Sequence, residues 1–246
     1  MKTSRSKLLF LNYFIASLHG VIHIAAGAAG FAVAVGAWAQ VPPSASEVAR
    51  YSGLLAAAHG GDVRQIESLL AGGADVNHRD AHGRTALHIA TFARKPDAVR
   101  TLIKGGAKTA LLENDKYDAV TVAAVADDEA TLRVLLANGA SAKLTTSRYD
   151  GTALIAAAHL GHDGVVKQLI AAGAPLDHVN NLHWTALIES IVLGNGGPRH
   201  VETLRALVKA GANLQLKDRS GNTPLALART RGYTDMVNIL MQAGAK

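Results

Sequence analysis

Residues 83–90 read Gly83-Arg84-Thr85-Ala86-Leu87-His88-Ile89-Ala90, and the dipeptide Gly106-Ala107 follows them. The Gly-Ala dipeptide recurs through the chain, as Gly73-Ala74, Gly106-Ala107, Gly139-Ala140, Gly173-Ala174, Gly211-Ala212 and Gly244-Ala245. The intervals between these glycines are 33, 33, 34, 38 and 33 residues. A nearly fixed period of about 20 to 50 residues is typical of stacked repeat proteins, so the sequence predicts six structural repeats.

Each copy carries the apolar pattern of one helix ahead of its Gly-Ala dipeptide. Two large apolar residues stand four and three positions before the glycine, and a third stands seven before it, which is helical spacing. These residues are Ile66, Leu69 and Leu70; Val99, Leu102 and Ile103; Leu132, Leu135 and Leu136; Val166, Leu169 and Ile170; Leu204, Leu207 and Val208; Val237, Leu240 and Met241. The glycine predicts the end of the helix, because Gly adopts the left-handed conformation of a helix C-cap at little cost.

A second, alanine-rich helix is expected upstream in every copy. A Thr suited to cap the helix N-terminus opens the clearest copies, at Thr85-Ala86-Leu87, Thr152-Ala153-Leu154, Thr185-Ala186-Leu187 and Thr223-Pro224-Leu225. The third copy departs most, because Asp118-Ala119-Val120 takes the same place. Its apolar residues Val120, Val122 and Ala123 still fit an inner helix.

These features resemble the ankyrin repeat, through residues 83–90, Gly106-Ala107 and the segment Ala74-Asp75-Val76-Asn77 of the preceding copy. The resemblance covers residues 52–246 and implies an all-α ankyrin-repeat solenoid of six helix–turn–helix repeats with short projecting hairpin loops. The repeats are expected at about residues 52–79, 80–113, 114–147, 148–179, 180–217 and 218–246. The resemblance also implies that His88 bridges neighbouring loops by hydrogen bonds.

The first 39 residues have the layout of an export signal. Lys2, Arg5 and Lys7 precede a stretch from Leu8 to Ala39 without a charged side chain, and Ala37-Trp38-Ala39 is an A-x-A site. We expect a signal peptide at residues 1–39, cleaved before Gln40. The alternative is an uncleaved anchor in the inner membrane, since about 20 apolar residues span a bilayer. Both interpretations place the repeats outside the cytoplasm, in the periplasm or, after cleavage, secreted.

Residues 40–51 are expected to form a linker and an N-terminal cap. Pro42 and Pro43 stop a helix from continuing, and Ser44 with Glu47 has the spacing of a capping box. The sequence therefore predicts a helix that starts near Ser44 and runs into the first repeat.

The resemblance implies that a partner protein contacts the hairpin loops and the inner helices. Trp184 is the first candidate, because it stands in the variable position before Thr185, which Arg84 and Asn222 occupy in other copies. Aromatic residues at such places are frequent binding hot spots. The alternative role for Trp184 is packing on the next hairpin. The partner-binding residues that we expect are Trp184, His183, Tyr117, Tyr149, Arg84 and His82.

The fifth copy is five residues longer than the second, and the excess lies in residues 194–200, Gly-Asn-Gly-Gly-Pro-Arg-His. A glycine-rich run before a helix can bind an anion through backbone N–H groups, with help from Arg199. This loop is the basis of an alternative function, a ligand-binding or enzymatic protein. Together with residues 181–187, it also resembles a group of bacterial ankyrin proteins with the same expanded copy.

Composition argues against several other functions. The chain has no cysteine, so thiolate metal sites and disulfides are excluded. Its formal charge of +6 falls to +3 without the three N-terminal cations, and Lys and Arg alternate with Asp and Glu, unlike a nucleic-acid-binding stripe. A metal ion at the tip of a hairpin could bind His78 with His82, or His178 with His183, but neither pair lies in a zinc motif. We expect no enzymatic activity, no cofactor, no bound metal, no nucleic-acid partner and a monomeric state.

Overall fold

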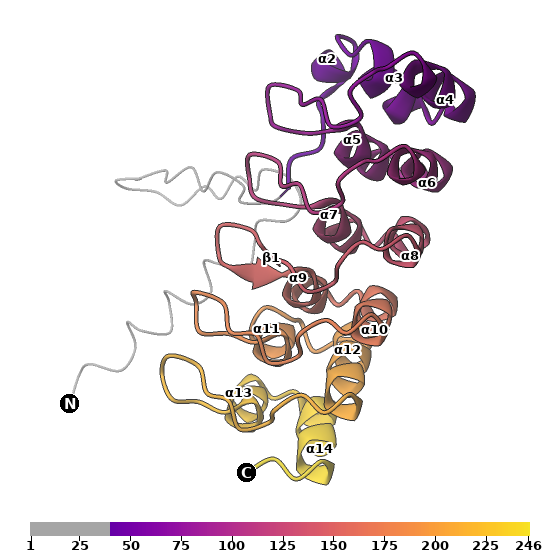
Figure 1. Ribbon diagram of the computed structural model, residues 1–246. Coiled ribbons are helices and arrows are strands. Elements are labelled where there is room, and N and C mark those ends of the chain that lie inside the picture. Colours follow the sequence, from indigo (N-terminus) through magenta and orange to yellow (C-terminus); the bar gives the residue numbers. More distant parts are fainter. Residues whose placement is uncertain (1–39) are drawn as a thin grey trace, which may run out of the picture. The chain divides into compact units, whose positions relative to one another are not determined.

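Two helices per repeat form two columns, and the hairpin loops project beside the inner column (Figure 1). The computed structural model describes residues 40–246, of which residues 42–246 form one unit. The inner helices are α3 (Gly53–Gly60), α5 (Ala86–Phe92), α7 (Ala119–Val125), α9 (Ala153–Leu160), α11 (Ala186–Val192) and α13 (Pro224–Arg231). The outer helices are α4 (Val63–Ala71), α6 (Pro96–Lys104), α8 (Glu129–Ala137), α10 (Asp163–Ala171), α12 (Pro198–Lys209) and α14 (Thr234–Gln242).

Each helix contacts its partner in the same repeat and the equivalent helix of each neighbouring repeat. The expected all-α solenoid of six repeats is therefore confirmed. The strands within residues 40–246 are β1 (Thr145–Thr146) and β2 (Gly151–Thr152), a short antiparallel pair that joins the ends of the third hairpin. The signal peptide or anchor that we expect at residues 1–39 lies outside the described residues. Between residues 40 and 246, no helix has both the length and the apolar character needed to cross a membrane.

The core is one continuous band of buried apolar side chains. In the second to sixth repeats, the first residue of each predicted apolar pair is buried, whereas the second is half-buried or exposed. The inner helices meet through small side chains with at most 2% exposure, Ala57, Ala58, Ala90, Ala123, Ala124, Ala157, Ala158 and Ala228. Small residues at these positions let neighbouring helices approach closely and leave few voids.

The helix ends follow the predicted signals. Thr152, Thr185 and Thr223 accept a hydrogen bond from the third backbone N–H of their helices. Asp118 does the same in the departing third copy, where its carboxylate accepts from Thr121 N at 2.8 Å. At the other end, Gly106 has φ +92°, a left-handed conformation that glycine adopts without strain. The third copy thus keeps the fold because Asp replaces Thr as the cap.

The N-terminal cap helix is shorter than expected. Ser44 and Glu47 form the predicted capping box of α2 (Ala45–Val48). The pKa of Glu47 is lowered to about 2, chiefly by the hydrogen bond from the Ser44 side chain. The expectation that this helix runs into the first repeat was wrong, because the chain leaves α2 after Val48 and α3 begins separately at Gly53. Gly53 has φ +52°, which marks the turn between the two helices.

The apolar pair of the third repeat provides a test of this packing. Leu135 is fully buried and Leu136 is half-buried, although the two are adjacent on α8. We expect Leu135→Ala to lower the free energy of unfolding by about 2–5 kcal/mol, because it leaves a cavity in the central stack. Leu136→Ala is the matched control and should cause a clearly smaller loss. Urea unfolding followed by circular dichroism measures both, and equal losses would contradict the assignment of the buried face.

Candidate protein-binding surface

One side chain anchors the tip of each of the five hairpins. It stands five residues before the residue that caps the next inner helix. Its oxygen accepts hydrogen bonds of 2.8–3.4 Å from backbone N–H groups of the same tip. These hairpin anchors are Asp80, Glu113, Ser147, Asn180 and Asp218. Side chains of this kind replace the missing backbone partners of a tight turn, so each hairpin holds a defined shape.

Hydrogen bonds also join each hairpin to the next. The pairs are Asn114 N to His82 O at 3.0 Å, Ser147 N to Lys116 O at 2.8 Å, Asn181 N to Tyr149 O at 2.9 Å and Arg219 Nη2 to Asn181 O at 2.9 Å. Side chains add further links, such as Arg79 Nη1 to Leu112 O at 2.8 Å and an ion pair between Arg148 and Asp115. The five tips therefore form one connected surface.

The bridging role implied for His88 is confirmed. Its Nδ1 lies 3.2 Å from Thr85 N and 2.9 Å from Thr85 Oγ1, and its Nε2 lies 3.2 Å from the Tyr117 carbonyl oxygen of the next hairpin. Because Nδ1 accepts from the Thr85 backbone N–H, the proton is on Nε2, which donates to Tyr117. Burial lowers the pKa of His88 to about 4, so the imidazole is neutral at pH 7.

The structure places most of the predicted contact residues on the hairpins as expected. His183 is exposed at its tip and Trp184 is half-buried beside it. Tyr117 and Tyr149 are also half-buried on the two preceding hairpins. Burial, followed by the nearby carboxylates Asp115 and Glu113, raises the pKa of Tyr117 to about 12. His82 is exposed, and its Nε2 lies 2.7 Å from the Glu47 carboxylate.

Arg84 does not belong to this exposed surface. Only 2% of the residue is accessible, because α2 and Tyr51 cover it. Its guanidinium lies 3.2 Å from the Glu47 carboxylate and 3.7 Å from that of Asp80. The expectation of exposure was drawn from the repeat pattern, in which Tyr117, Trp184 and Asn222 fill the same position. It failed because the cap helix precedes only the first hairpin.

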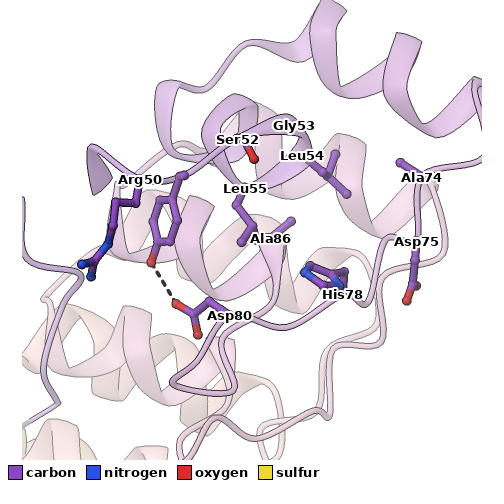
Figure 2. A pocket seen from close by; sticks show the side chains of 11 residues that line it. Arg50, Ser52, Gly53, Leu54, Leu55, Ala74, Asp75, His78, Asp80 and Ala86 are labelled. Carbon is purple, nitrogen blue, oxygen red and sulfur yellow. Dashed lines mark hydrogen bonds between the residues drawn. The ribbon is translucent and has the colours of Figure 1, made fainter. Parts of the chain in front are cut away.

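A pocket of about 490 Å³ lies beside the first hairpin and the start of α3 (Figure 2). Its lining includes Arg50, Asp75, His78 and Asp80. Figure 2 shows Arg50 and His78 on different sides of the pocket, and a dashed line marks the 2.9 Å hydrogen bond from the Tyr51 hydroxyl to Asp80. Burial, followed by this hydrogen bond, raises the pKa of Tyr51 to about 12. The hydrogen bond between Tyr51 and Asp80 thus connects the cap segment to the hairpin.

The expanded fifth repeat lengthens its outer helix. Helix α12 has 12 residues, whereas each of the other outer helices has 9. The loop before it packs on its neighbours: the Tyr233 hydroxyl donates to the Gly194 carbonyl at 2.9 Å, and the Tyr233 ring lies against Gly196. On the other side, His200 Nε2 donates to the His159 carbonyl at 2.9 Å. The expansion therefore fills a position between the fourth and sixth repeats.

Arg199, which we considered as an anion-binding residue, has two protein partners. Its guanidinium lies 2.8 Å from the Asp127 carboxylate of the third repeat and 3.3 Å from the Asp163 carboxylate of the fourth. The hydrogen bond that Arg199 donates to Asp127 is the main cause of its raised pKa. A guanidinium held by two carboxylates is poorly suited to bind a further anion.

Three of the four histidines considered as metal ligands, His82, His178 and His183, have side-chain contacts within the protein. His82 faces Glu47, and His178 Nε2 donates to the Asp150 carbonyl at 2.6 Å. In the part of the chain that the structure describes, no three His, Cys, Asp or Glu side chains are arranged to hold a metal ion.

Glu189 is a buried carboxyl group that the sequence reasoning missed. It is 5% exposed on α11, and Asn180 Nδ2 donates to its Oε1 at 2.7 Å. His159 Nδ1 lies 3.8 Å from its Oε2. Burial raises the pKa of Glu189 to about 8 and lowers that of His159 to about 4. An acidic residue in an inner helix whose other residues, apart from Ser190, are apolar was the available signal.

A family model for ankyrin repeats in three copies matches residues 54–146, 121–197 and 154–246. The ankyrin repeat protein YahD of Escherichia coli (strain K12) is 33% identical over 192 residues, which are 78% of this chain and 95% of that protein. An ankyrin repeat domain of Acinetobacter baumannii AYE has a solved structure with a TM-score of 0.74 and 44% identity, covering 78% and 98% of the two chains. The solved structure of the ankyrin repeat protein EF0377 has a TM-score of 0.72 and 31% identity, and the match covers 78% of this chain and 98% of that one.

The raised pKa of Glu189 predicts a specific pH dependence of stability. In the unfolded chain the carboxyl ionises near its ordinary pKa of 4.5, whereas the folded protein keeps the proton until about pH 8. The stabilising contribution is therefore full below the unfolded value and is lost as pH rises to about 8. Glu189→Gln keeps the amide contact without the titration.

The quantity to follow is the difference in unfolding free energy between the wild type and Glu189→Gln. We expect this difference to fall by about 2–4 kcal/mol between about pH 5 and pH 8.5. Urea unfolding at several pH values measures this difference. Titrating groups that both proteins share, such as His88, contribute equally to the two unfolding free energies and cancel in the difference. A difference independent of pH would show that Glu189 is ionised in the folded protein.

Proposed function

The chain belongs to the ankyrin-repeat family, and we propose that it is a protein-binding scaffold that acts outside the cytoplasm and contacts its partner through the hairpin tips. The observation that carries this proposal is the connected set of hydrogen bonds from the first hairpin to the fifth. The hairpin anchors hold each tip, and the links between tips hold the tips together. A surface that is ordered before binding loses little conformational entropy on association.

The chemistry of the tips also suits a protein partner. Tyr117, Tyr149 and Trp184 lie half-buried on three successive hairpins, where their rings rest partly on the protein. Large aromatic side chains that are already held in place contribute much contact area at little entropic cost. Exposed polar groups such as His183 surround them. This arrangement is typical of an interface with an apolar centre and a polar rim.

We propose that the protein is not an enzyme. Within residues 40–246, the strongest candidates for chemistry have structural partners: Arg199 is held by two carboxylates, and the loop of residues 194–200 is packed on Tyr233 and His200. At the pocket, Tyr51 and Asp80 are likewise engaged in a hydrogen bond between the cap segment and the first hairpin. None of these groups pairs a nucleophile with a base in the way that hydrolytic catalysis requires.

Export rests on the N-terminal sequence. The three N-terminal cations and the uncharged stretch from Leu8 to Ala39 support transport of the repeats across the inner membrane. We expect protein purified from its native host to start at Gln40, because signal peptidase cleaves after an A-x-A site. Intact-mass spectrometry of the periplasmic and membrane fractions measures this. A full-length chain in the membrane fraction would instead support an anchor, and recovery in the cytoplasm would contradict export.

The binding surface is tested by site-specific photocrosslinking in intact cells. A photoreactive amino acid at position 183, on the Trp184 hairpin, should capture a defined partner protein. The same group at Glu67, an exposed position on outer helix α4, should not. We expect Trp184→Ala to lower the yield at position 183 by at least about tenfold, since hot-spot aromatic residues contribute about 2 kcal/mol or more and about 1.4 kcal/mol corresponds to a factor of ten.

The matched control is Met241→Ala, which removes an exposed large apolar side chain from α14, away from the hairpins. It should leave the yield unchanged. If positions 183 and 67 capture the same proteins, or if both alanine variants crosslink like the wild type, the Trp184 hairpin is not the contact surface.

A further inference from the structure

The anchor of the fourth hairpin differs from its counterparts in one chemical respect: Asn180 is an amide. Its Oδ1 accepts hydrogen bonds from Leu182 N and Trp184 N, both at 3.0 Å. These two donors fix which end of the amide is the oxygen, so its Nδ2 must point the other way. Asn180 is only 4% exposed, so this nitrogen needs a partner inside the protein.

Glu189 supplies that partner. Its Oε1 accepts from Asn180 Nδ2 at 2.7 Å, and both residues are buried. A chain of hydrogen bonds therefore runs from α11 through Asn180 to the backbone of the hairpin that carries Trp184. Without Glu189, the amide nitrogen would stay buried without an acceptor, which costs more than the loss of an ordinary exposed hydrogen bond.

The other repeats serve as internal controls. In each, the residue nine positions after the hairpin anchor occupies the place of Glu189, and it is Ile89, Val122, Ala156 or Leu227. The corresponding anchors are Asp80, Glu113, Ser147 and Asp218, none of which has an amide nitrogen to satisfy. The buried carboxyl thus occurs in the one repeat of residues 80–246 whose anchor is an amide.

We propose that Glu189 is a positioning residue for the Trp184 hairpin: it holds Asn180 in the orientation that fixes residues 182–184, and so sets how Trp184 meets a partner. The inference rests on the proposed function of that hairpin as a contact surface. Glu189 does not touch the partner and acts only through Asn180.

Hydrogen exchange of the full chain, followed by mass spectrometry, tests the positioning role without any partner. In Glu189→Leu, the peptide that covers residues 180–185 should exchange about fivefold faster or more, because a buried hydrogen bond is lost. The equivalent hairpin at residues 218–223 should be unchanged. Glu189→Gln should restore slow exchange, since its carbonyl oxygen still accepts from Asn180.

A double variant that gives the fourth hairpin the same anchor and partner types as another repeat is the most decisive test. Asn180→Asp combined with Glu189→Leu gives an acidic anchor with an apolar partner, like Asp80 with Ile89. It should exchange at the rate of the wild type. If Glu189→Leu leaves residues 180–185 unchanged, or if the double variant exchanges as fast as Glu189→Leu alone, position 189 affects only core packing and the inference is wrong.

Photocrosslinking at position 183 then separates this inference from the proposed function. If the hairpin loosens in Glu189→Leu and the yield falls with it, both hold. If the hairpin loosens as expected but the partner is captured equally well, Glu189 still positions the hairpin, and the Trp184 hairpin is not the contact surface.

Discussion

Every element of this protein depends on burial between neighbouring repeats. A pair of short helices cannot cover its own apolar face, so each pair is stable only when the next pair packs against it. Alanines such as Ala90 and Ala123 let the inner helices approach, and leucines such as Leu102 and Leu135 fill the space between inner and outer helices. The fixed period follows from this constraint, because each repeat must present the same surface to the next.

The hairpins are held by a different interaction. In a tight turn, backbone N–H groups lack the partners that a helix or strand would give them. A single side-chain oxygen in each loop accepts from the turn, and the residue type varies as long as an oxygen is available. The fourth hairpin, anchored by Asn180, shows the consequence of such a change. Asn180 keeps the oxygen but adds a buried nitrogen, and Glu189 satisfies it at the cost of a carboxyl group in the core.

The two departures from regular repetition are both explained by contacts between distant parts of the chain. The longer fifth repeat extends α12, and Arg199 joins carboxylates of the third and fourth repeats. At the N-terminal end, α2 covers Arg84, whereas Trp184 at the equivalent position is only half-buried. Individual surface ion pairs contribute little, so these contacts matter mainly by holding irregular segments in place.

The sequence by itself determined the six repeats, the helix pairs and the helix caps, because these features recur with a local pattern, whereas the bridge made by His88 was implied by the family resemblance. Helical spacing, a capping residue and a glycine C-cap act within a few residues and can be read directly. The burial of Arg84, the carboxylate partners of Arg199 and the link between Glu189 and Asn180 were decided only by the tertiary structure. Each joins residues whose proximity depends on how the repeats stack, and no local pattern encodes that geometry.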